Sequence, residues 1–270
     1  MIPTPPIPSQ RPAPPWTSWE KWLQSPPGRY VLGWEQRCFD QIVCDVFGFH
    51  ALQIGLPQMN ALSENRMPLH ALLMHANDNR ELASRFHWHL VEGNSTELPF
   101  ANESLDLIVL PHVLEFAADP HQILREVDRV LRPEGRLIIS GFNPASLWGA
   151  RQYLSRLIGS PYLPRDGQFI GLIRIKDWLQ LLNYSLDRGH FGCYKFPLQG
   201  DAAMKRMDFL ESMGNRWWPI FGAVFLVSAI KRQQGIRLIG QVQTVRAPTM
   251  AQLSPAAERS KLRTPIKEAP

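Results

Sequence analysis

The 270-residue chain has little cysteine and no long apolar run, and both absences exclude classes of protein. Its three cysteines, Cys38, Cys44 and Cys193, are too few for a disulfide scaffold, and none forms a Cys-x-x-Cys pair of the kind that binds zinc. The longest apolar stretch, 217–230, contains a proline and a glycine and is shorter than the roughly 20 residues that span a membrane. No basic segment followed by an apolar one opens the chain, so no Sec-type signal is expected. We therefore expect a reduced, cytoplasmic protein.

Basic charge is concentrated at one end of the chain. The formal net charge is +5, but residues 231–270 hold eight basic and two acidic side chains, so the remainder is close to neutral. This tail lacks the interleaved aromatic residues that stack on bases, so only its charge points to nucleic acid. Nine of the 24 prolines lie in the first thirty residues, which excludes continuous helix or sheet there. We expect a proline-rich leader at 1–28, a folded domain at 29–232 and a disordered tail at 233–270.

Tryptophans at helical spacing precede the folded domain. Trp16, Trp19 and Trp22 are followed by Pro-Pro-Gly at 26–28, which is expected to break the chain between two helices. A longer helix is predicted over about 29–47, because apolar residues fall on one stripe while Glu35 and other charged residues lie off it. Two interpretations stay open for the tryptophans, namely core packing and a lid over a ligand.

From His50 onward, short apolar strands alternate with helices, which is typical of an open, mostly parallel α/β sheet with helices on both faces. The predicted strands lie at 51–55, 71–74, 88–91, 105–110, 136–140, 190–197 and 222–231. The predicted later helices lie at 119–132, 175–182 and 202–213. The prediction is therefore a doubly wound, mostly parallel sheet of seven strands.

The segment between the fourth and fifth strands is the clearest unit in the sequence. Asp119 can cap a helix that Pro120 begins, and Pro-Glu-Gly at 133–135 can end it. A right-handed βαβ unit of this kind opens its loops after Leu110 and Ser140 at the carboxyl edge of the sheet, where ligands bind. Residues 142–165 are rich in Gly, Pro, Asn and aromatic residues and are expected to form an insertion over this edge.

The stretch 92–144 resembles the second half of a class I S-adenosylmethionine-dependent methyltransferase domain, in its type 11 branch. The resemblance rests on Gly93-Asn94, on the Leu-Pro-Phe turn at 98–100, on Ser-Leu-Asp at 104–106 and on the Leu-Arg-Pro-Glu-Gly turn at 131–135. It implies the Rossmann-like methyltransferase fold over about 48–231 and S-adenosylmethionine as the cofactor. The cofactor-binding residues that it implies are Gln53, Gly55, His75, Asn94, Ser95, Glu97, Leu98, Leu110 and Pro111.

The first half of the expected domain departs from the family pattern. The family has an acidic residue, any residue and then Gly-x-Gly at the end of the first strand, and here the chain reads Gln53-Ile54-Gly55-Leu56-Pro57. A neutral amide binds the ammonium group of the donor more weakly than a carboxylate does. His75 falls where the family has an acid for the ribose hydroxyls. Asn94 takes the place of the more usual aspartate at the adenine edge, and it is equally interpreted as a turn amide.

Methyl transfer from a sulfonium depends on positioning of donor and acceptor more than on a catalytic dyad. His112 and Glu115, after the fourth strand, are the catalytic candidates, although His112 is also interpreted as a satisfied loop histidine. Asn143, Tyr153 and Tyr162 are further candidates on the acceptor side.

Two functions remain from different classes. The first is a methyltransferase whose unidentified acceptor is a small molecule or a lipid. The second is a catalytically silent methyltransferase-like module that binds a ligand or partner, which the altered glycine loop favours. Other classes lack their motifs: there is no Gly-x-Gly-x-x-Gly for a nicotinamide cofactor and no Gly-x-Ser-x-Gly for a hydrolase, and His87-x-His89 alone is too small a ligand set for a metal.

Overall fold

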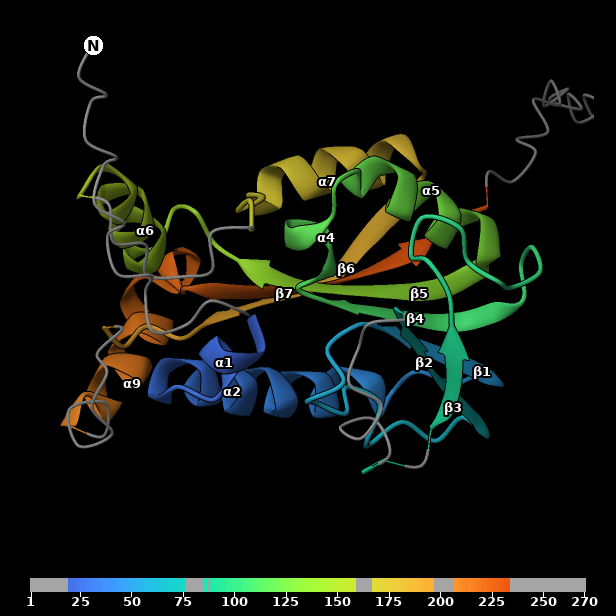
Figure 1. Ribbon diagram of the computed structural model, residues 1–270, viewed down its shortest axis with the longest axis horizontal. Helices are drawn as coiled ribbons and strands as arrows, with labels where there is room; N and C mark the ends of the chain where they lie inside the picture. Colours follow the sequence, from blue (N-terminus) through green and yellow to red (C-terminus); the bar gives the residue numbers. More distant parts are fainter. Residues whose placement is uncertain (1–18, 76–84, 87, 159–166, 197–205, 234–270) are drawn as a thin grey trace, which may run out of the picture. The chain divides into compact units, whose positions relative to one another are not determined.

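The computed structural model describes residues 19–75, 85–86, 88–158, 167–196 and 206–233. Over these residues, seven strands form one sheet in the order β3-β2-β1-β4-β5-β7-β6 (Figure 1). The strands are β1 (His50–Ile54), β2 (Leu69–Met74), β3 (His89–Glu92), β4 (Leu105–Pro111), β5 (Leu131–Phe142), β6 (Tyr184–Gly192) and β7 (Val224–Lys231). Strands β1 to β5 are parallel, whereas β7 runs antiparallel to both β5 and β6. The predicted mostly parallel, seven-stranded sheet is confirmed.

Helices cover both faces of the sheet (Figure 1). Helices α1 (Trp19–Leu23) and α2 (Pro26–Val43) lie on one face, and α4 (Val113–Phe116), α5 (Pro120–Val130) and α7 (Leu172–Leu181) lie on the other. Helices α6 (Leu147–Ile158) and α9 (Asp208–Trp217) and the 3-10 helix η1 (Pro219–Phe221) complete the described part. Successive strand side chains point to opposite faces, so Leu107 and Val109 pack with α2 while Ile108 and Leu110 pack with α5.

Helix α2 begins three residues earlier than predicted. Ser25 is its N-cap, and its Oγ accepts a hydrogen bond from the Gly28 nitrogen at 3.3 Å. Pro26 and Pro27 occupy the first turn, where a missing N–H leaves no helical hydrogen bond unmade. The Pro-Pro-Gly segment therefore starts the helix instead of preceding it.

The sixth strand was predicted at 190–197 and lies at Tyr184–Gly192. It is an edge strand that pairs only with β7, and the side chains of Ser185 and of residues 187–190 are exposed. Because neither its pairing nor its burial requires a continuous apolar run, the strand has no hydrophobic signature in the sequence.

Asp106 fixes the beginning of β1 to the neighbouring strand. Its carboxylate accepts hydrogen bonds from the backbone nitrogens of Phe49 at 2.8 Å and His50 at 3.0 Å, and it pairs with Arg132 at 3.0 Å. Partial burial opposes ionisation, but these hydrogen bonds and the guanidinium lower the pKa of Asp106 below its usual value. The aspartate of the Ser-Leu-Asp motif thus supports the sheet that carries the site.

Candidate functional site

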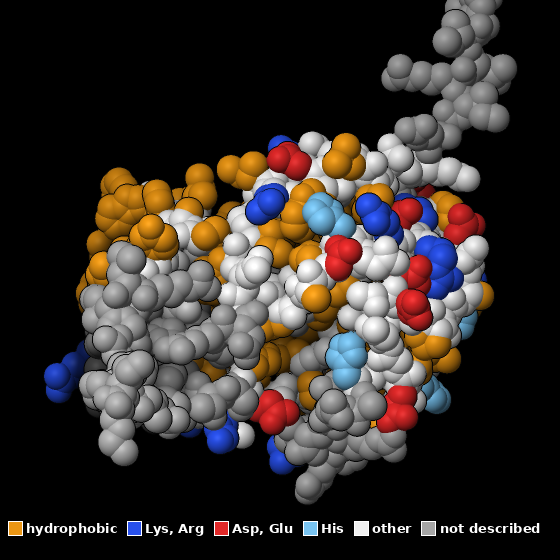
Figure 2. Space-filling view, turned by 45° about the horizontal axis from the view of Figure 1, so that its top comes forward, with side chains coloured by type: hydrophobic (Ala, Val, Ile, Leu, Met, Phe, Trp, Pro, Cys, Tyr) orange, Lys and Arg blue, Asp and Glu red, His pale blue; other side chains and the backbone are white. Residues whose placement is uncertain are grey.

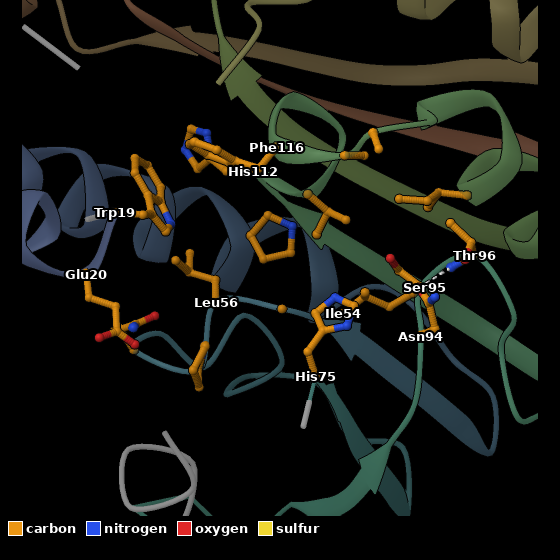
Figure 3. A pocket seen from close by; sticks show the side chains of 18 residues that line it. Trp19, Glu20, Ile54, Leu56, His75, Asn94, Ser95, Thr96, His112 and Phe116 are labelled. Atoms are coloured by element: carbon orange, nitrogen blue, oxygen red, sulfur yellow. Dashed lines mark hydrogen bonds between the residues drawn. The ribbon is translucent and has the colours of Figure 1, made fainter. Parts of the chain in front are cut away.

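A pocket with a volume of about 730 Å³ opens where β1, β2, β3 and β4 end (Figure 3). Each of these strands supplies one residue to the pocket wall. Gly55 and His75 directly follow β1 and β2, Asn94 lies two residues after β3, and Pro111 is the last residue of β4. Further lining residues are Trp19, Glu20, Ile54, Leu56, Pro57, Gln58, Ser95, Thr96, His112, Val113, Phe116, Ala117, Ala118 and Ile123. The pocket therefore has the size and the place at the carboxyl edge expected of a ligand site in a parallel sheet.

Helix α1 contributes both a core residue and a wall residue. Trp22 is fully buried, whereas Trp19 stacks on it with ring centroids 5.1 Å apart and lines the pocket. The Trp19 ring also lies 5.2 Å from His112 and 4.9 Å from Phe116, across the pocket rim (Figure 3). Core packing is confirmed for Trp22, whereas Trp19 lies at the pocket wall, where a lid over a ligand stays a prediction. Trp16 lies outside the described residues.

Gln53 is buried behind the pocket and is not among its lining residues. Its side-chain nitrogen donates to the backbone oxygens of Gly55 and Leu56, both at 3.1 Å, and of Met59 at 2.9 Å. Its side-chain oxygen accepts from the Ala61 nitrogen at 2.9 Å. The amide therefore holds the loop after β1 in shape, a task that requires donors and that a carboxylate cannot perform.

The loop that Gln53 supports leaves the pocket open. Gly55 has a φ of 70°, a left-handed conformation that glycine adopts without strain, and its nitrogen donates to Leu73. A Cβ added at Gly55 would lie 3.4 Å from Val113. Pro57, which replaces the second glycine of the family pattern, forms part of the wall.

The segment after β3 turns through Asn94, Ser95 and Thr96, all of which line the pocket. The Asn94 side-chain oxygen accepts from the Thr96 nitrogen at 3.1 Å, so Asn94 is a turn amide as well as a wall residue (Figure 3). Glu97 and Leu98 are not lining residues. Glu97 is exposed elsewhere on the surface, and Leu98 is buried in the core.

The Leu-Pro-Phe turn is held against α5. The Leu98 nitrogen donates to Glu126 at 3.0 Å, and Arg129 donates to the backbone oxygens of Leu98 and Phe100, both at 2.9 Å. The turn thereby fixes the exit of β3 and the position of the pocket wall that precedes it.

His112 stands between two buried carboxylates. Its Nδ1 lies 2.7 Å from Glu115 Oε2, and its Nε2 lies 3.0 Å from Glu35 Oε1, although the latter contact lacks the alignment of a hydrogen bond. The other Glu115 oxygen accepts from the Phe142 nitrogen. His112 lines the pocket, whereas Glu35 and Glu115 lie behind it, each at most 4% exposed. The sequence placed Glu35 off the buried stripe of α2, and this expectation was wrong, because Glu35 is buried against His112.

The two carboxylates decide the charge of His112. Burial acts to lower the pKa of the imidazole, but the nearby Glu35 and Glu115 outweigh it and raise the pKa of His112 to about 10. Burial also raises the pKa of Glu115. At neutral pH the imidazolium carries protons on both nitrogens, and both nitrogens face carboxylates, so His112 has no lone pair with which to accept a proton.

The remaining candidates have other roles or lie outside the described residues. The Asn143 side chain is buried and donates to the backbone oxygens of Ile220 at 2.7 Å and Gly222 at 3.0 Å. Tyr153 is exposed on α6, Leu110 is buried in the core, and neither lines the pocket. Tyr162 lies outside the described residues.

The described residues offer neither a metal site nor a membrane span. Within the described residues, no group of three His, Cys, Asp or Glu side chains is arranged to hold a metal ion. Nor does any helix in the described ranges have the length and apolar character needed to cross a bilayer.

Comparisons with known proteins agree on one family. Residues 69–139 match the type 11 methyltransferase domain. The chain is 30% identical over 233 residues to the uncharacterized protein YafS of Escherichia coli K12, covering 86% of this chain and 88% of that protein. It is 35% identical over 85 residues to the ubiquinone/menaquinone biosynthesis C-methyltransferase UbiE of Vibrio cholerae, an alignment that covers 30% of this chain and 31% of that enzyme.

The fold has counterparts among solved structures. A S-adenosylmethionine-dependent methyltransferase of Thermotoga maritima, described as a possible histamine N-methyltransferase, aligns with a TM-score of 0.57. The alignment covers 79% of this chain and 94% of that one, at 16% identity. The likeness supports the fold assignment.

Proposed function

Because the chain belongs to the class I S-adenosylmethionine-dependent methyltransferases, in the type 11 branch, we propose that it transfers a methyl group from this donor, bound in the 730 Å³ pocket, to a small-molecule or lipid acceptor. The observation that carries the proposal is the convergence of four strand ends on one pocket with polar and apolar walls. Parallel sheets bind nucleotide-like ligands at this edge.

The residues of the pocket fit the donor. Asn94, Ser95 and Thr96 offer polar groups for its adenosine part, and Ile54, Pro111 and Ile123 offer apolar surface. Gly55 permits close approach of the backbone to its amino-acid part. The bound donor supplies an electrophilic sulfonium methyl group.

Glu20 can take the role of the acid that the family has at the end of the first strand. Gln53 replaces the family acid and faces away from the pocket, whereas Glu20 of α1 is the acidic side chain among the described lining residues. It lines the pocket together with Pro57 and Gln58. We assign to it the attraction of the donor's ammonium group.

His112 serves to position, not to remove a proton. Its ring is fixed by Glu115 and Glu35 and packs against Trp19 and, at 4.5 Å between ring centroids, against Phe142. Its rigid position at the pocket wall excludes water and orients the ligands, which is the main requirement of methyl transfer.

Titration calorimetry with S-adenosylmethionine and S-adenosylhomocysteine tests the donor site. We expect heat of binding with both ligands, and we expect Gly55→Val to abolish it, because the φ of 70° is strained for valine and its side chain would project beside Val113. The matched control is Gly33→Val on the outer side of α2, where an added Cβ meets only the Arg37 side chain, at 3.9 Å.

Two outcomes would contradict the proposal. Unchanged affinity in Gly55→Val would show that the donor lies elsewhere. Absence of heat with the unaltered protein at millimolar ligand would leave the catalytically silent module as the function.

A further inference from the structure

Large apolar side chains are exposed over one end of the described chain. Ten of the fifteen exposed large hydrophobic residues belong to α6, to the end of the β6 segment and to α9 with η1: Leu147, Tyr153, Leu154, Phe196, Phe209, Met213, Trp217, Trp218, Ile220 and Phe221. We call these residues the aromatic face. Hydrophobic side chains gather at this end of the molecule in Figure 2. Patches of this extent on a protein surface mark sites of interaction.

The parts of the aromatic face are joined by hydrogen bonds. Trp148 of α6 donates its indole N–H to the Lys195 oxygen at 2.7 Å, and Tyr194 donates to the Pro219 oxygen at 2.7 Å. Asn143, which precedes α6, binds the Ile220 oxygen. The elements that carry the aromatic face are therefore held together by hydrogen bonds.

The aromatic face begins at the same edge of the sheet as the pocket. Phe142 ends β5 and pairs with Val224, the first residue of β7, so α6 and η1 both join the sheet at its carboxyl edge. A row of buried aromatic rings connects the two: Trp22 lies 5.6 Å from Phe142 and 6.4 Å from Trp148, and Trp22 stacks on Trp19 of the pocket wall.

The charge of this end is positive. Among the described side chains of α6, of α9 and of the residue before α9's cap, Arg151, Arg206 and Arg216 are basic and Glu211 is acidic. Arg206 and Arg216 are exposed. Glu211 faces inward instead, accepting hydrogen bonds from the backbone nitrogens of Cys193 and Tyr194, both at 3.2 Å. Exposed tryptophan, tyrosine and phenylalanine beside arginine match the headgroup region of an anionic bilayer.

We propose that the aromatic face is a docking surface for an anionic lipid bilayer, with Trp217, Trp218, Ile220 and Phe221 entering the headgroup region and Arg206 and Arg216 facing the lipid phosphates. Docking in this way brings the carboxyl edge of the sheet, and with it the pocket, toward the bilayer. The inference does not depend on methyl transfer, since it rests on exposure and charge alone.

Co-sedimentation of the full chain with vesicles tests the proposal. We expect binding to vesicles of phosphatidylglycerol and phosphatidylcholine in equal parts, and weaker binding to phosphatidylcholine alone or at high salt. The double substitution Trp217→Glu and Trp218→Glu should weaken binding at least about tenfold, because it removes apolar contact and adds negative charge. Phe209→Glu, on the same helix as Trp217, should weaken it as well.

Phe47→Glu is the matched control. Phe47 is 76% exposed but precedes β1, at the opposite edge of the sheet, so vesicle binding should be unchanged. Urea denaturation shows that each variant is folded, and this control does not depend on ligand binding at the donor site. The proposal is overturned if the unaltered protein stays in the supernatant, if the tryptophan variant binds as well as the unaltered protein, or if light scattering shows a dimer that the variant dissociates without any vesicle binding.

Discussion

Gln53 is the residue at which the family pattern and the structure make opposite predictions, and Gln53→Glu separates them. The substitution restores the family acid at the end of β1. In the structure, however, the side-chain nitrogen donates to three backbone oxygens, a part-buried one and a buried one at 3.1 Å and a second buried one at 2.9 Å. A carboxylate offers no donor to them, and even a protonated carboxyl group offers one.

The expected cost follows from these contacts. A buried carbonyl left without a donor lowers the free energy of unfolding by about 1–3 kcal/mol, and relaxation of the loop reduces this loss. We therefore expect Gln53→Glu to lower the free energy of unfolding by about 3 kcal/mol. Since Gly55 and Leu56 line the pocket, distortion of the loop should also weaken binding of S-adenosylhomocysteine.

Urea denaturation at neutral pH, followed by calorimetry with S-adenosylhomocysteine, measures both effects. Gln180→Glu on the exposed side of α7 is the control and should change the free energy of unfolding by less than about 0.5 kcal/mol. If Gln53→Glu were as stable as the unaltered protein and bound the ligand more tightly, Gln53 would face the donor and the loop-supporting role would be refuted.

Two further substitutions test the charged groups. The raised pKa of His112 means that the stability gained from its protonation is fully present below pH 6.5 and is lost as pH rises through about 10. Glu35→Gln should therefore flatten the fall in unfolding free energy between pH 7 and 9.5 in urea denaturation, and an unchanged slope would contradict the coupling. Asp106→Ala should cost about 2 kcal/mol at neutral pH by removing two backbone hydrogen bonds and an ion pair. Because the pKa of Asp106 is lowered, the destabilisation by Asp106→Ala should become smaller as pH falls below 3.8. The same destabilisation at pH 3 as at pH 7 would refute the lowered pKa.

The parallel part of the sheet was predictable because its strands are buried on both faces. β4 carries an apolar run that the structure buries almost throughout, and Asp119 caps α5 as expected, accepting from the nitrogens of His121 and Gln122. β6 was misplaced because an edge strand needs no such run. The start of α2 was misplaced because prolines in a first turn were interpreted as a break.

The site was predictable only in part. Gly55, His75, Asn94, Ser95 and Pro111 line the pocket because each follows or ends a parallel strand. Glu35 and Glu20 were missed, since both come from helices that precede the sheet in sequence and reach it only through tertiary packing. Burial of a charged residue in an amphipathic helix has no local signal when its partner lies far along the chain.

A crystal structure of the protein with S-adenosylhomocysteine tests the central claim, that the pocket at the ends of β1 to β4 holds the methyl donor. We predict adenosine against Asn94, Ser95 and Thr96, the amino-acid part between Gly55 and Glu20, and the Gln53 amide still bound to its loop. Ligand density outside this pocket, or a loop at Gly55 and Pro57 that closes it, would contradict the account.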